Sequence, residues 1–231
     1  MLTRVFSAAI QGVEALEVEI EVNTGPGEPK IIVVGLPDVA VKESKDRVTT
    51  AIANSGFRWP RERTTINLAP ADIKKEGPSF DLPIAIGMIA SAQSASLPRL
   101  ERCLVAGELA LTGEIRPVKG ALPIAIEARE RGKKAVVLPI ANAAEAAIVE
   151  GIDVYGVANL REAYEFLAKQ TELSPVIGNA ADRLSVHSPD EVDFAEVKGQ
   201  QLVKRAVEVA VAGGHNILMI GNNNPLFCRG Q

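Results

Sequence analysis

The end of the chain has part of the pattern that a nucleotide-binding loop requires. In the segment HNILMIG (215–221), residues 216–221 predict a buried strand, and a glycine after a strand often opens a phosphate-binding loop. Such a loop also needs a second glycine followed by Lys and Ser or Thr, which bind the phosphates and the Mg²⁺ ion. The corresponding positions hold Leu226, Phe227 and Cys228. We therefore expect no nucleotide-binding residue in this chain.

A basic segment with an aromatic residue is the second place where the sequence could do chemistry. Residues 56–65, GFRWPRERTT, contain three arginines around a tryptophan. Arginines can bind a phosphate backbone and an aromatic ring can stack on a base, although a solvated loop is the alternative. Basic residues of the preceding helical segment could add phosphate contacts. The predicted DNA-contact candidates are Arg58, Trp59, Arg61, Arg63, Lys42, Lys45 and Arg47.

Carboxylates form two weaker candidates. Glu108 and Glu114 bracket a turn, which fits either an acid–base pair or a solvated hairpin. The spacing of Asp72, Glu76 and Asp81 matches no strong metal-binding motif. We therefore expect no metal site.

The composition is that of an ordinary globular protein. The 231 residues are 47% hydrophobic and 23% charged, with a net charge of −4, so only a local basic patch could bind nucleic acid. The two cysteines, Cys103 and Cys228, indicate neither a disulfide framework nor a zinc site. We see no signal peptide and no apolar run long enough for a membrane span. A cytoplasmic protein without a membrane partner is expected.

Hydrophobic periodicity predicts a mixed order of strands and helices in two unequal parts. The turn GPGEP at 25–29 joins the first two predicted strands, which we expect to pair. Two short strands are expected within 103–118, around Thr112 and Gly113. The first two predicted strands are 16–25 and 30–37, and further strands are expected at 64–70, 135–142 and 152–159. The predicted helices are 38–56, 81–93, 121–134, 143–151, 160–170 and 199–212.

Several segments resemble one family, the ComM-type Mg-chelatase-like AAA+ proteins. Residues 193–221 resemble the opening of an AAA+ module, from an Asp-Phe loop through a helix into GGHNILMIG. Residues 1–48 and 66–91 resemble the N-terminal domain of the same family. The resemblance implies a Lon-like (ChlI-type) domain at 1–172, a linker at 173–191 and the N-terminal fragment of an AAA+ ATPase domain at 192–231.

The N-terminal domain of that family resembles the proteolytic domain of Lon, which implies an α+β fold like that of ribosomal protein S5 domain 2. The similar segments are EGPSFDLPIA (76–85), residues 107–128 and residues 132–139. The resemblance places Ser79 at the nucleophile position and Ile124 at the position of the activating lysine. A serine hydroxyl needs an adjacent base, and Lys119 precedes the helix while Lys74 and Lys75 are expected to face solvent. We therefore expect Ser79 to be a helix N-cap.

For an intact protein of this family, the resemblance implies ATP and Mg²⁺ as cofactors, a homo-hexameric ring and DNA branch migration in natural transformation. The Lon-like domain would guide DNA or stabilise the ring. Two alternatives stay open: a Lon-related serine peptidase with an unusual base, and an ATPase subunit of the Mg-chelatase type.

Overall fold

The computed structural model describes residues 2–58, 62–178 and 199–220. It divides into two compact units, Met1–Ala180 and Ala181–Gln231, which are considered separately. The first unit has an α+β fold whose main sheet is mostly parallel, since four of its six strand pairings are parallel. An α+β fold class was predicted, and it is confirmed at this level.

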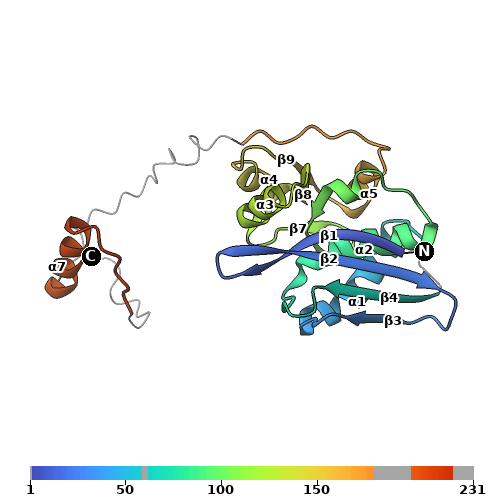
Figure 1. Cartoon of the computed structure of the whole chain (residues 1–231), viewed down its shortest axis with the longest axis horizontal. Helices are drawn as coiled ribbons and strands as arrows, with labels where there is room; N and C mark the ends of the chain where they lie inside the picture. The colour runs from blue at the N-terminus through green and yellow to red at the C-terminus, as the bar shows by residue number, and fades with distance from the viewer. Residues whose placement is uncertain (1, 59–61, 179–198, 221–231) are drawn as a thin grey trace. The chain divides into compact units, whose positions relative to one another are not determined.

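The main sheet of the first unit has seven strands in the order β3-β4-β2-β1-β5-β8-β9. Figure 1 shows β1 and β2 as long neighbouring strands, with β4 and then β3 beyond β2. The strands are β1 (Leu2–Gln11), β2 (Glu14–Gly25), β3 (Ile31–Val34), β4 (Arg63–Ala69), β5 (Cys103–Val105), β8 (Ala135–Pro139) and β9 (Asp153–Val157).

A tight hairpin joins β1 to β2. Gln11 pairs with Glu14, so the loop has only Gly12 and Val13, and Gly12 has a φ of 65° that glycine adopts without strain. Strand β1 was not predicted. The predicted pairing of the first two strands is also wrong: β2 pairs with β1 and β4, and β4 separates β2 from β3.

Helices cover both faces of the sheet. One apolar cluster joins the sheet to α1 (Val39–Asn54), α2 (Asp81–Gln93) and α5 (Leu160–Leu167). The other joins it to α3 (Ala121–Glu130) and α4 (Ile140–Ala146). Along β8, Val137 belongs to the first cluster and Val136 to the second, as expected for alternate residues of a strand that is buried on both faces.

Short elements connect these layers. The turns η1 (Pro78–Phe80) and η2 (Leu100–Arg102) precede α2 and β5. Strands β6 (Glu108–Leu109) and β7 (Ile115–Arg116) form a small separate hairpin, which confirms the predicted strand pair around Thr112 and Gly113. After α5, the Val176 N–H donates to the Val154 carbonyl at 2.8 Å.

The second unit contains α7 (Gln201–Ala212), close to the predicted helix at 199–212. Residues 215–220 are not a strand, so the predicted strand at 216–221 is wrong over the part that the structure describes. A strand needs a hydrogen-bonded neighbour, and no described strand pairs with these residues. Residues 221–231, with the loop positions 226–228, lie outside the described residues.

Candidate functional site

Ser79 lies in the turn η1, directly before α2. Its carbonyl accepts a hydrogen bond from the Gly107 N–H at 2.9 Å. The N-cap prediction for Ser79 is wrong, because the residue in the N-cap position of α2 is Phe80 and no side chain caps the helix. The η1 turn continues directly into α2, so Ser79 stands one residue too early to cap it.

Ile124, which the resemblance to Lon aligns with the activating lysine, has apolar surroundings. Ile124 lies on α3 with an exposed fraction of 0%. It packs in the cluster that also contains Ala106, the neighbour of Gly107. Within the described residues, the Ser79 side chain makes no hydrogen bond to a lysine or to any other group. A serine without a base is a weak nucleophile.

Lys75 is buried, contrary to the prediction that it faces solvent. Its exposed fraction is 0%, and its ammonium group donates to the Pro70 carbonyl. Burial lowers the pKa of Lys75, because the charged form is desolvated. Lys74 is exposed, as predicted, and pairs with Glu76. Lys75 therefore holds the loop before Ser79, and its amine is directed at a backbone carbonyl.

Asp81 and Arg47 form an ion pair between α2 and α1. Arg47 Nε lies 2.9 Å from Asp81 Oδ2, and Arg47 Nη2 lies 3.2 Å from Oδ1. The Leu109 N–H also donates to Oδ2, at 3.3 Å. Burial raises the pKa of Asp81 to about 6, because desolvation outweighs the bonds from Arg47. The sequence offered a signal for this pair: a carboxylate inside an apolar helix needs a partner.

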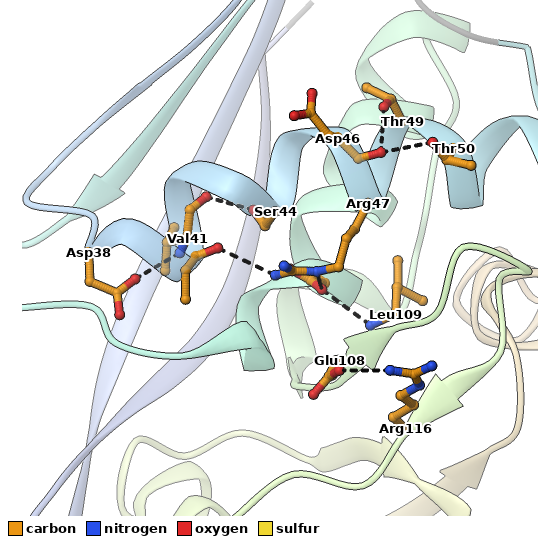
Figure 2. A network of polar contacts seen from close by, with 12 residues as sticks. Asp38, Val41, Ser44, Asp46, Arg47, Thr49, Thr50, Glu108, Leu109 and Arg116 are labelled. Atoms are coloured by element: carbon orange, nitrogen blue, oxygen red, sulfur yellow. Dashed lines mark hydrogen bonds and ion pairs between the residues drawn. The ribbon is translucent and has the colours of Figure 1, made fainter.

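Asp38 ties the same region together from the other end of α1. Its Oδ1 accepts from the Val41 N–H at 2.7 Å and caps α1, as Figure 2 shows. Its Oδ2 accepts from the Gly77 N–H at 3.1 Å. The loop that carries Ser79 is therefore fixed to α1 by one side chain. Asp38 was not among the predicted functional residues.

The DNA-contact candidates fall into three groups. Arg58, Lys45 and Arg63 are exposed and form no ion pair with any described residue. Trp59 and Arg61 lie outside the described residues, and for Lys42 only the backbone, in α1, is described. Arg47 is only 28% exposed and is engaged by Asp81 and the Ala40 carbonyl. We therefore leave Arg47 out of the DNA-contact set.

The remaining carboxylates do not form a catalytic pair. Glu108 pairs across the small hairpin with Arg116, with Oε1 and Nη1 at 3.4 Å, which supports the hairpin interpretation. Glu114 is exposed at the turn. Over residues 2–58, 62–178 and 199–220, no group of three or more His, Cys, Asp or Glu side chains could hold a metal ion. In the same ranges, no helix is long and apolar enough to cross a membrane.

Comparison with protein-family models defines the class of protein. Residues 20–142, more than half of the chain, match the model described as subunit ChlI of Mg-chelatase. Residues 193–224 match the model described as magnesium chelatase, subunit ChlI. The chain therefore belongs to the ChlI family of Mg-chelatase-like proteins, and within it to the ComM and YifB type.

Individual relatives support the assignment of the chain to the ComM and YifB type. The chain is 40% identical over 223 residues to the competence protein ComM of Haemophilus influenzae, covering 95% of this chain and 43% of that protein. It is 40% identical over 221 residues to the uncharacterized protein YifB of Escherichia coli, covering 95% and 42%. The DNA repair protein RadA of Bacillus subtilis is 30% identical over 164 residues, covering 68% and 34%. The chain thus spans less than half the length of these relatives.

Proposed function

We propose that the first unit is a non-peptidase, Lon-like domain of an ATP-dependent AAA+ protein that acts on DNA. Its role is to guide DNA or to support assembly of the ring. One observation carries the non-peptidase part: Ile124 is fully buried in an apolar cluster at the position where a base would activate Ser79. The alternative, a Lon-related peptidase, lacks support because no described lysine reaches the Ser79 hydroxyl.

The proposal includes a specific fold and domain division. The first domain, 1–172, has the ribosomal protein S5 domain 2-like fold, and the AAA+ segment occupies 192–231 after a linker at 173–191. The placement of Ser79 before α2 and of Ile124 on α3 supports a Lon-like arrangement. Superposition of an experimental structure on a Lon proteolytic domain tests it, and a different strand connectivity would reject it.

For the longer protein we propose ATP and Mg²⁺ as cofactors, a homo-hexameric ring formed by the AAA+ domain, a cytoplasmic location and a role in competence as a DNA branch-migration helicase. The resemblance to ComM-type proteins and the name of the Haemophilus relative support this. ATPase and branch-migration assays with light scattering test these points; a monomer without DNA-stimulated ATPase activity would contradict them. Activity only in Mg²⁺ insertion into a porphyrin would favour the chelatase alternative.

The DNA part is supported by exposed cations and by the name of a DNA repair relative. We expect the 231-residue chain to bind DNA through Arg58 and Arg63, so the double Arg58→Ala, Arg63→Ala variant should bind more weakly. Removal of each phosphate-binding arginine should reduce the slope of log K against log salt by about 1. Fluorescence anisotropy with a labelled oligonucleotide at several salt concentrations measures both quantities.

Arg102→Ala is the matched control, because Arg102 is exposed but lies in η2, outside the basic segment. It should bind DNA like the unmodified chain. If the double variant binds as tightly as this control, the two arginines are not DNA contacts. If the unmodified chain binds neither single-stranded nor duplex DNA, this domain does not guide DNA.

A further inference from the structure

A shallow, open pocket lies where three segments that are distant in the sequence meet. Its volume is about 320 Å³, near the lower end of the range for small-ligand sites. The end of α1, the β6–β7 turn and the start of α5 line it, and every lining residue is either polar or glycine. The residues used below are Asn54, Thr112, Glu114, Asn159 and Arg161.

The backbone around the pocket is held in place. Gly113 has a φ of 89°, and a Cβ at this position would overlap Ser55 Oγ, so only glycine fits the turn. The Leu160 N–H donates to the Gly113 carbonyl at 2.9 Å, and Asn54 Nδ2 donates to the Leu111 carbonyl at 2.7 Å. The turn is therefore fixed to both helices. A ligand would not have to order it.

Arg161 supplies a cation at the pocket. Its Nη2 donates to the Ser55 carbonyl at 2.6 Å, and its guanidinium carbon lies 5.2 Å from the centre of the Phe57 ring. Glu165 lies 3.7 Å from Nη1, and the Arg161 side chain is 53% exposed. A guanidinium group has five N–H donors, so several stay available for an anion. Phe57 directly precedes Arg58, so the fold brings Arg161 to the start of the predicted basic segment.

The other lining groups suit the uncharged, hydrogen-bonding part of a ligand. The Glu114 carboxylate has no partner among the described residues and can accept hydrogen bonds from an amino group. The Thr112 hydroxyl offers a donor and an acceptor. Asn159 Oδ1 caps α5 by accepting from the Glu162 N–H, and Asn54 Nδ2 donates to the Leu111 carbonyl, so these amides offer the Asn159 N–H groups and the Asn54 oxygen. A matching ligand is therefore anionic at one end and carries hydrogen-bonding groups at the other. A nucleotide has this combination.

We propose that this pocket binds one nucleotide unit of single-stranded DNA, with its phosphate on Arg161 and its base edge on Thr112 and Glu114. This inference rests on the proposed function, DNA binding by the first unit, and adds the form of DNA and the site. A base inside a duplex is stacked and paired, so it cannot enter a pocket without being extruded. The pocket therefore favours single strands.

The test compares two variants of the 231-residue chain with a matched control. Thr112→Tyr fills the pocket from an exposed turn position, and Arg161→Gln removes the cation but keeps an amide that can bond to the Ser55 carbonyl. Arg102→Gln is the control. Anisotropy is measured with one labelled oligonucleotide, single-stranded and annealed to its complement. We expect Arg161→Gln to lose about tenfold in single-strand affinity, the effect of about one charge-assisted contact. Thr112→Tyr should lose a similar factor because its ring occupies the pocket, and both variants should lose less affinity for the duplex.

The outcomes separate this inference from the proposed function. Binding of both DNA forms with an unchanged single-strand preference in the two variants overturns the pocket and leaves DNA binding by the domain intact. An equal loss for both forms also overturns it, since that result indicates a general phosphate contact. If the unmodified chain binds no DNA, both proposals fail. Thermal unfolding of each variant shows that the fold is retained.

Discussion

At the scale of single residues, burial decides which side chains can react. Among the described residues, Ser79 has no base beside its hydroxyl, Lys75 has its amine bound to the Pro70 carbonyl, and Ile124 is buried in an apolar cluster. Cys103 is buried as well, and desolvation raises the pKa of its thiol to about 11. The thiolate is the reactive form of cysteine, so Cys103 is inert near neutral pH.

Ser79 should therefore not react as a nucleophile. We expect a fluorophosphonate probe to leave the chain unlabelled, because no residue that the structure describes is placed to accept the proton of the hydroxyl as it attacks. Mass spectrometry after incubation measures the modification. The Ser79→Ala variant is the control for labelling elsewhere, and modification of Ser79 that disappears in this variant would revive the peptidase alternative.

At the scale of elements, the pair of Arg47 and Asp81 joins α1, α2 and the start of the small hairpin. The pair is not simply stabilising, since the carboxylate is fully buried and desolvation is costly. The raised pKa of Asp81, about 6 against an ordinary value of 3.8, expresses this cost. Two hydrogen bonds to the carboxylate orient the Arg47 guanidinium group, and a third links α2 to Leu109.

The raised pKa of Asp81 predicts a pH dependence of stability. Between about pH 4 and pH 6, the window from the ordinary pKa to the raised one, the folded state retains a proton that the unfolded state has released. The contribution of Asp81 to the free energy of unfolding should therefore fall as pH rises through this window, by up to about 3 kcal/mol, and then level off. Urea unfolding at a series of pH values measures it.

Asp81→Asn removes this titration. The unfolding free energy of the unmodified chain minus that of the variant should therefore be more positive at pH 4 than at pH 7. Parallel curves for the two proteins would show that Asp81 titrates alike in the folded and unfolded states. Arg47 stays in place in both, so the comparison isolates the carboxyl group.

At the scale of the whole molecule, the two units differ in how they bury apolar surface. Both apolar clusters are made of residues from the first unit alone, and Leu173 and Val176 near the end of that unit pack against them. In the second unit, Leu202, Leu218 and Ile220 are exposed. The first unit therefore carries its own core.

This difference predicts that residues 1–178 fold independently. Their Tm should match that of the corresponding transition in the 231-residue chain, because both apolar clusters stay complete. A chain ending at 172 is the matched comparison: it lacks Leu173 and Val176 and should melt several degrees lower, for a loss of about 2 kcal/mol. Equal Tm values for the two lengths would support the predicted boundary at 172 instead. Calorimetry distinguishes these results.

The sequence alone determined much that depends on local pattern. The helix at 81–93 has the observed bounds, since its apolar, small-residue run has no competing structure. The family was also readable, because motifs such as EGPSFDLPIA and GGHNILMIG are contiguous in the chain. The expectation that Ile124 stands where Lon has its activating lysine came from the same resemblance.

Only the tertiary structure decided which distant segments meet. Strand β1 could not be distinguished from other mixed apolar segments until its pairing with β2 and β5 was known, and β4 separates β2 from β3 through contacts remote in sequence. Burial of Lys75, the partner of Asp81 and the approach of Arg161 to Phe57 likewise depend on packing between elements. Periodicity encodes which face of an element is apolar, but the free energy that selects its neighbours comes from long-range contacts.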